Sequence, residues 1–165
     1  MPRLKRRGTI VILNGALAFH CMPYIRIWVH VVWSTKERVP YLQSPFRYQL
    51  FQHIRENALG KGIYLDSING YTDHVHGLIS LRSDQNIAKV VQLMKGESAY
   101  WINKNRLTQD TFGWQDEYFA ISVGESTVER VRQYIRNQEQ HHQRKTFMDE
   151  YHEIISKYRF ERLKG

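Results

Sequence analysis

The chain has 165 residues, with 24 lysines and arginines against 16 aspartates and glutamates, which gives a formal net charge of +8. Hydrophobic residues at 42% and aromatic residues at 13% exclude an intrinsically disordered chain, because such chains lack the apolar surface that offsets conformational entropy. The single cysteine excludes a disulfide-bonded scaffold and favours a reducing compartment, so we expect a cytoplasmic protein.

The N-terminal residues imitate the front of a secretory signal. Basic residues at 5–7 precede an apolar run at 9–19, but Asn14 and Gly15 interrupt that run. We therefore expect residues 1–21 to be an appendage, for example from an upstream start codon, in preference to a cleaved signal. The remaining residues, 22–165, have the length of one domain with one core.

Hydrophobic periodicity predicts an alternation of strands and helices along the rest of the chain. Ser44-Pro45 is an N-cap and first-turn signal, and residues 126–129 form a capping-box pattern. Strands are expected at 24–33, 62–69, 74–81 and 118–123, and helices at 45–60, 87–101 and from 126 to 135, with a short helix near 148–158. This order predicts an α+β, ferredoxin-like (split βαβ) fold: a four-stranded antiparallel sheet with helices on one face and an extra C-terminal helix.

Two histidines alternate on the third predicted strand. The period of two directs His74 and His76 to one face and Val75 to the other, so both imidazoles can converge on one metal ion. Taken alone this signal is weak, because the chain has 8 histidines and such pairs arise by chance. The alternative is a strand whose exposed face carries two partly solvated histidines.

The third helix carries a second candidate group. Tyr134 and Gln138 are four residues apart and share a helical face with Arg130. The apolar residues Val131 and Ile135 lie beside them, so packing that side on the sheet would direct Tyr134 and Gln138 toward its polar face. A glutamine offers a neutral carbonyl oxygen as a ligand. The alternative is a tyrosine that simply packs at the margin of the core.

These residues belong to a pattern that resembles the small single-tyrosine transposases of bacterial and archaeal insertion sequences, in the HUH endonuclease superfamily. The resemblance runs from about Tyr24 to Tyr158. It rests on HVVWSTK at 30–36, DHVH at 73–76, GWQ at 113–115, SV at 122–123, YIRNQ at 134–138 and HH at 141–142. Each motif is unspecific alone, whereas their joint order is highly specific.

The resemblance implies a fold, a chemistry and a set of partners. Tyr134 would be the nucleophile, and His74, His76 and Gln138 would bind a divalent metal, Mg²⁺ or Mn²⁺, although imidazole also suits zinc and iron. The enzyme would cut and rejoin single-stranded DNA through a 5′-phosphotyrosine intermediate. It would act as a homodimer on imperfect hairpins, with the tyrosine helix of one protomer placed over its partner's metal site.

Other polar and aromatic residues are candidates for DNA contacts. We expect Lys95 and Arg130 to contact phosphates, the alternative being that the positive charge is spread over solvated faces. Because adjacent helical residues point about 100° apart, at most one of His141 and His142 can join the metal site. The residues that could stack on bases are Trp28, His30 and Trp114, although core packing is the expected place of the tryptophans.

Two other functions are compatible with the same sequence. A domesticated relative could act on dispersed genomic palindromes. A non-catalytic ferredoxin-like module could instead use its sheet to bind nucleic acid. A rolling-circle replication nuclease is disfavoured, because that class usually pairs its tyrosine with lysine, whereas this chain has Gln138.

Overall fold

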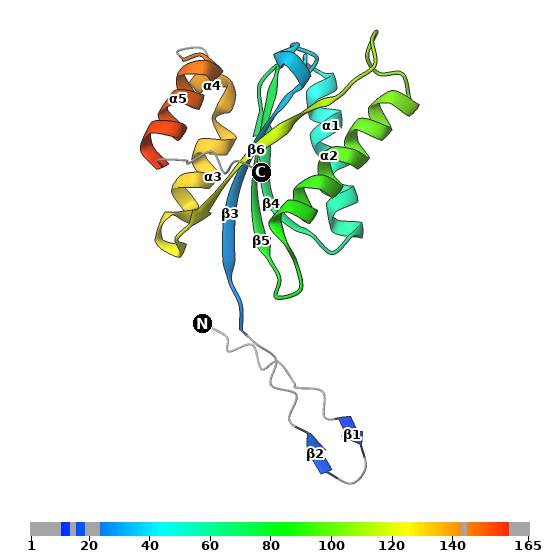
Figure 1. Ribbon diagram of the computed structural model, residues 1–165, viewed down its shortest axis with the longest axis vertical. Coiled ribbons are helices and arrows are strands. Elements are labelled where there is room, and N and C mark those ends of the chain that lie inside the picture. Colours follow the sequence, from blue (N-terminus) through cyan, green and yellow to red (C-terminus); the bar gives the residue numbers. More distant parts are fainter. Residues whose placement is uncertain (1–10, 14–15, 19–23, 143–144, 159–165) are drawn as a thin grey trace.

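The computed structural model describes residues 11–13, 16–18, 24–142 and 145–158 of the chain. Its main sheet has four antiparallel strands in the order β4-β5-β3-β6 (Figure 1). The strands are β3 (Ile27–Thr35), β4 (Tyr64–Gly70), β5 (His74–Leu81) and β6 (Trp114–Val123). Two central strands joined by helical crossovers to the edge strands make up the ferredoxin-like arrangement, so this prediction is confirmed.

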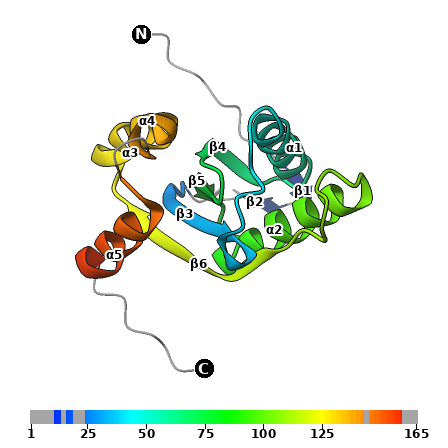
Figure 2. The ribbon, with the colours of Figure 1, turned by 90° about the horizontal axis from the view of Figure 1, so that it is seen from above.

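Helices cover both faces of the sheet. Figure 2 shows α1 and α2 on one side and α3, α4 and α5 on the other. Short 3₁₀ helices, η1 (Lys36–Arg38) and η2 (Glu125–Thr127), follow β3 and β6. The α-helices in the described ranges are α1 (Phe46–Gly60), α2 (Ile87–Lys104), α3 (Val128–Arg136), α4 (Gln138–His142) and α5 (Phe147–Tyr158). The two ferredoxin helices thus share one face, and the additional C-terminal helices close the other.

The alternation of the central strands creates two separate apolar clusters. On the α1–α2 face, Val31 and Val75 belong to the larger core. On the opposite face, Trp28 and Leu78 pack with Val128 and Ile135 of α3 in a smaller cluster. Burial of these side chains supplies the hydrophobic free energy that holds α3 against the sheet.

The structure differs from the sequence prediction at several element ends. β6 begins at Trp114, four residues before the predicted start, because a register shift between Trp33 and Thr35 of β3 lets Thr35 pair with Trp114. The predicted capping box is wrong: the Thr127 hydroxyl donates to the Gly124 carbonyl oxygen at 2.9 Å, and α3 starts without a side-chain cap.

Two further differences concern helix and strand starts. Ser44 does not cap α1. The helix begins at Phe46, so Pro45 occupies the N-cap position, and no side chain makes a capping hydrogen bond there. β3 begins at Ile27, so residues 24–26 precede the strand.

The prediction for residues 1–21 falls mostly outside the described residues. Within that range, β1 (Val11–Leu13) and β2 (Ala16–Ala18) pair with each other as a separate two-stranded sheet (Figure 1). The assignment of residues 1–21 as an appendage therefore stays a prediction. None of the helices in the described ranges combines the length and the apolar composition needed to span a bilayer.

We expect Ile135→Ala to lower the free energy of unfolding by about 2–5 kcal/mol, because the fully buried side chain leaves a cavity between α3 and the sheet. Urea denaturation measures the change. Leu59→Ala is the control, since Leu59 is 77% exposed and its truncation should leave stability nearly unchanged. Equal effects of the two substitutions would contradict the packing of α3 described above.

Candidate active site

His74 and His76 lie on the face of β5 that points toward α3, α4 and α5. They pair across the sheet with Ser34 and Val32 of β3, and neither imidazole is accessible to solvent. Val75, between them, belongs to the core on the other face. The predicted alternation is therefore present, but both histidines are buried rather than partly solvated.

The chain reaches His74 through a close turn between β4 and β5. The backbone N–H of Tyr71 donates to the carbonyl oxygen of His74 at 3.1 Å. A Cβ atom on Gly70 would lie 2.1 Å from that same oxygen, so a side chain cannot be accommodated there. Glycine is required at this position because the two strands approach each other directly beside the first histidine.

Each of the two histidines is oriented through its Nδ1 atom. His74 Nδ1–H donates to the carboxylate of Asp73 at 2.7 Å, and His76 Nδ1 is hydrogen-bonded to His30 Nε2 at 3.0 Å. The Nε2 atoms of His74 and His76 are buried and have no hydrogen-bond partner within residues 24–142 and 145–158. Metal-binding histidines are typically held in this way, with one nitrogen hydrogen-bonded and the other free to bind the ion.

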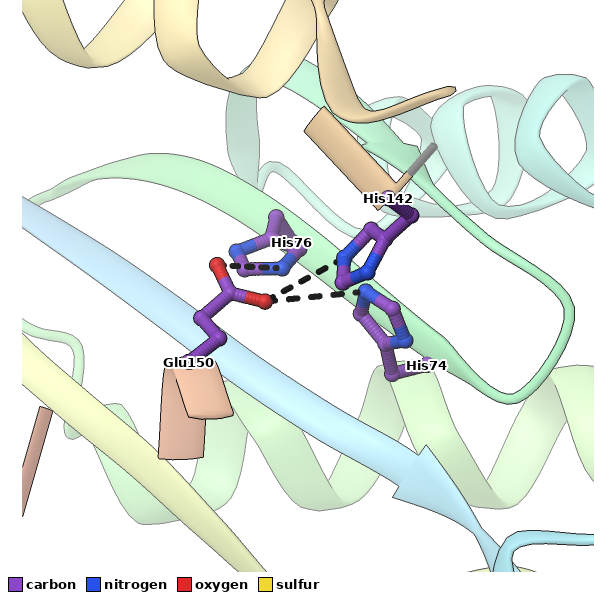
Figure 3. A group of neighbouring side chains, drawn as sticks. All are labelled: His74, His76, His142 and Glu150. Atoms are coloured by element: carbon purple, nitrogen blue, oxygen red, sulfur yellow. Dashed lines mark ion pairs between the residues drawn. The ribbon is translucent and has the colours of Figure 1, made fainter. Parts of the chain in front are cut away.

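Two more potential metal ligands, His142 and Glu150, lie beside the histidines and come from the C-terminal helices (Figure 3). Glu150 of α5 is 2% exposed, and its carboxylate oxygens lie 3.6 Å from His76 Nε2, 4.0 Å from His74 Nε2 and 3.3 Å from His142 Nε2. The ligand atoms of all four residues lie within 4.8 Å of one another. Neither oxygen of Glu150 has a hydrogen-bond partner among the described residues.

Gln138 joins the same cluster from the start of α4. Its amide group donates to the Tyr134 carbonyl oxygen at 3.3 Å, and its Oε1 atom lies 3.2 Å from His142 Nε2. His142 Nδ1–H donates to the Lys145 carbonyl oxygen at 3.0 Å, so Nε2 of the neutral ring carries a lone pair. Two acceptors therefore face each other, an arrangement that a shared cation would satisfy.

Burial shifts the pKa values of three of these side chains and so sets their protonation states. It holds the pKa of His76 well below its usual range, an effect that neighbouring His74 reinforces, and it lowers the pKa of His142 to about 4. Burial also raises the pKa of Glu150 to about 7. The two imidazoles are thus neutral at pH 7 and available as ligands, and a bound cation would favour the ionised form of Glu150.

The chemistry of this donor set fits a divalent cation. Imidazole nitrogens, an amide oxygen and a carboxylate converge without a positively charged side chain among the described residues that pairs with Glu150. Buried polar groups without partners are costly, and a cation would satisfy all of them at once. The residues predicted as ligands, His74, His76 and Gln138, are therefore brought together.

Sequence reasoning anticipated one further member of the cluster and missed another. Of the two adjacent histidines, His142 joins, in agreement with the limit of one. Glu150 was not anticipated, although a signal exists: it lies on the same stripe of α5 as Phe147, Tyr151 and Ile154. A carboxylate within an apolar stripe indicates a buried charge, which needs a partner.

Tyr134 stands beside the histidines. Its ring centroid lies 5.7 Å from that of His76, 6.1 Å from that of His30 and 5.3 Å from that of His141, each pair edge to face. α3 ends at Arg136, so Tyr134 and Gln138 belong to successive helices, yet both are turned toward the same cluster. The two side chains therefore point in the same direction, as their spacing of four residues predicts, although the helix is interrupted at Asn137.

An ion pair at the edge of the sheet fixes the helix that carries the tyrosine. Arg132 of α3 donates from Nε and an Nη atom to the two carboxylate oxygens of Asp66 in β4, at 2.9 and 2.8 Å. This arrangement lowers the pKa of Asp66, chiefly through the hydrogen bonds from Arg132. A two-point contact restrains rotation of α3 as well as its distance from the sheet.

The two predicted phosphate contacts lie in different places. Arg130 is exposed on α3, the helix of Tyr134. Lys95 is on α2, which covers the opposite face of the sheet, and its ammonium group donates to the carbonyl oxygens of Gln115 and Asp116 at 2.6 and 2.9 Å. The structure therefore does not bring Lys95 to the histidine cluster, and both phosphate contacts stay predictions.

The aromatic residues considered for base stacking are buried. Trp28 is 7% exposed and Trp114 8%, and each belongs to an apolar cluster, so core packing of the tryptophans is confirmed. His30 is also buried, and burial together with His76 lowers its pKa to about 3.

Solved structures of similar fold include transposases. A structure described as a candidate transposase from Deinococcus radiodurans R1 superposes with a TM-score of 0.58 at 25% identity, covering 74% of this chain and 98% of that one. The structure of a REP-associated tyrosine transposase bound to a REP hairpin gives a TM-score of 0.56. At 14% identity, over 76% of this chain and 74% of that one, the second likeness shows a shared fold alone.

Sequence similarity extends through the same residues. The ISDra2 transposase TnpA of Deinococcus radiodurans is 28% identical over 114 residues, which are 66% of this chain and 81% of that protein. The family model for IS200-like transposases matches residues 24–138, from the residues before β3 to Gln138. The chain therefore belongs to the family of IS200-like transposases.

Proposed function

We propose that the protein is a metal-dependent DNA transposase that cuts and rejoins single-stranded DNA at the ends of an insertion sequence, with Tyr134 as its nucleophile. The observation that carries this proposal is the placement of the Tyr134 ring against His76, beside a buried group of unpartnered ligand atoms. A nucleophile next to a cation site suits metal-assisted phosphoryl transfer, because the ion can polarise the phosphate that the nucleophile attacks.

The proposed reaction conserves the energy of the phosphodiester bond. The Tyr134 hydroxyl loses its proton as its oxygen attacks the scissile phosphorus, and the phosphorus–3′-oxygen bond breaks. A 5′-phosphotyrosine and a free 3′-hydroxyl result. A 3′-hydroxyl later attacks the same phosphorus and releases the tyrosine, so rejoining needs no external energy source.

His74, His76 and Gln138 would hold the metal ion, which we propose to be Mg²⁺ or Mn²⁺. When bound, the ion supplies positive charge that polarises the scissile phosphate and stabilises the departing oxygen. Asp73 accepts the Nδ1–H of His74 and so fixes its tautomer, and His30 orients the His76 ring through Nδ1, so that both Nε2 atoms point into the site. Gln138 is fixed by its bond to the Tyr134 carbonyl oxygen, which links the ligand to the helix of the nucleophile.

The partners follow from charge and from the family. A net charge of +8 favours a polyanion, and Arg130 on the helix of Tyr134 and Lys95 on α2 are our proposed phosphate contacts. We propose hairpin ends of single-stranded DNA as the substrate and a homodimer as the acting form. A DNA substrate and the single cysteine favour the cytoplasm.

We further propose that Tyr134 serves the metal site of its own protomer. Two interactions between α3 and the sheet of the same chain support this: the ring contact of Tyr134 with His76 and the ion pair of Arg132 with Asp66. Ile135 adds a buried apolar anchor. Moving α3 to another protomer would break all of them together.

Tyr134→Phe should abolish the covalent protein–DNA adduct and leave hairpin binding nearly unchanged, because it removes only the nucleophilic oxygen. A labelled single strand on a denaturing gel reports the adduct. Tyr100→Phe is the matched control, since Tyr100 is an exposed tyrosine on α2, and it should retain the adduct. An undiminished adduct in Tyr134→Phe would exclude Tyr134, and a wild type without any adduct would favour a non-catalytic binding module.

Gln138→Ala should raise the Mn²⁺ concentration needed for cleavage, whereas His74→Ala combined with His76→Ala should remove cleavage altogether. Loss of the Gln138 amide removes one neutral ligand, whereas the double substitution removes both imidazoles with buried Nε2 atoms, so the double variant should bind the metal more weakly. Titration of cleavage with Mn²⁺ separates the variants. A Gln138→Ala curve that overlies the wild type would exclude Gln138 as a ligand.

Mixing inactive Tyr134→Phe with inactive His74→Ala/His76→Ala protein should not restore cleavage, because each tyrosine would face the metal site of its own chain. Subunit exchange must first be verified with tagged protomers. If the tyrosine acted on its partner's site, about half of the dimers would be mixed and each would carry one working site of two. Recovery of single-strand cleavage to about a quarter of wild type would therefore overturn the single-protomer arrangement.

A further inference from the structure

We infer that His142 and Glu150 are two further ligands of the metal ion, supplied by a C-terminal segment that follows the family-matched residues. The match ends at residue 138, whereas His142 and Glu150 come from α4 and α5. Their Nε2 and carboxylate atoms lie within 4.8 Å of those of His74 and His76. This inference rests on the metal site of the proposed transposase and extends its ligand set.

The state of Glu150 is the first argument. Its carboxylate is almost completely buried, and within the described ranges its oxygens face the Nε2 atoms of the three histidines of the cluster at 3.3–4.0 Å. His142 uses Nδ1–H to donate to the Lys145 carbonyl oxygen, so Nε2 of its neutral ring meets Glu150 as a lone pair. An ionised carboxylate buried against that lone pair is strongly unfavourable, and a cation between the two groups removes the conflict.

The second argument is that α5 is built to hold Glu150 there. Phe147, one turn earlier, stacks on the His74 ring with centroids 4.3 Å apart and planes 16° apart. Arg38 of η1 lies over the rings of Phe147 and Tyr151, at 4.6 and 5.4 Å from their centroids. These contacts fix α5 on both sides of the carboxylate, so its position beside the histidines is not incidental.

The enlarged ligand set favours a class of metal. Three imidazoles suit transition-metal ions, whereas Mg²⁺ prefers oxygen donors and retains several waters. Ligation by His74, His76 and His142 with Glu150 therefore favours Mn²⁺, Fe²⁺, Co²⁺ or Zn²⁺ over Mg²⁺. The same contacts make metal binding and the docking of α5 one linked event, because the ion would join α5 to β5.

Glu150→Gln tests the ligand role with little change of shape, and Glu153→Gln on the same helix is its matched control, with a side chain that is 65% exposed. Calorimetric titration of the purified, metal-free protein with Mn²⁺ should show affinity reduced at least about tenfold by Glu150→Gln. Glu153→Gln should bind Mn²⁺ as the wild type does. His142→Phe, which keeps a ring stacked on Tyr71, should also weaken binding, whereas His152→Phe should not.

Thermal unfolding distinguishes a ligand from a residue that only supports the fold. Without metal, Glu150→Gln should unfold at the same temperature as the wild type or higher, because an amide is cheaper to bury than an unpartnered carboxylate. With Mn²⁺ the order should reverse, since the wild type binds the ion more tightly. Amide hydrogen exchange should show metal-dependent protection of α5 in the wild type and less in Glu150→Gln.

Three results would overturn the inference: unchanged Mn²⁺ affinity in Glu150→Gln, lower stability of this variant without metal and no reversal with it, or equal wild-type affinity for Mg²⁺ and Mn²⁺. The first two would remove Glu150 from the ligand set, and the third would remove the metal preference. None of them would affect the Tyr134 adduct. An adduct that persists in Tyr134→Phe, or a wild type that forms none, would instead contradict the proposed function, so the two failures are distinguishable.

Discussion

Burial of both faces of the central strands is the constraint on which the rest of the structure depends. Val31 and Val75 face α1 and α2, while Trp28 and the histidines of β5 face the C-terminal helices. A sheet of this kind needs a cover on each side, and a cover over imidazoles must also supply polar partners. The second layer therefore serves two ends: it buries Leu78 and encloses the ligand atoms.

The position of Tyr134 follows from that second layer. Ile135 anchors α3 in the apolar cluster, Arg132 holds it to Asp66, and the break at Asn137 turns Gln138 into the site. Three independent restraints on one short helix leave little freedom to the residue between them. Holding a nucleophile in a reactive orientation is worth several kcal/mol of the barrier, on the order of 7–11 kcal/mol in favourable intramolecular cases.

Local patterns sufficed to predict much of this arrangement. Strand alternation predicted that His74 and His76 share a face, and helical spacing predicted that Tyr134 and Gln138 do. What failed depended on contacts between distant segments. The early start of β6 needs the shifted pairing of Thr35 with Trp114, and the burial of Glu150 needs α5 to place it beside His74 and His76 of β5. Both contacts join segments that are far apart in the chain, so the residue pattern of a single helix or strand does not predict them.

The carboxylate changes the electrostatic balance of the site. Imidazoles and an amide alone would leave the ion's two positive charges uncompensated, whereas ligation by the Glu150 carboxylate would offset one of them. The ligand groups are held in different ways: hydrogen bonds through a second atom fix His74, His76, His142 and Gln138, whereas neither oxygen of Glu150 has a hydrogen-bond partner in the described part of the chain. Glu150 is instead positioned through its helix, because Phe147 stacks on His74 and Arg38 lies over the rings of Phe147 and Tyr151. The negative charge that would balance the ion therefore depends on the docking of α5.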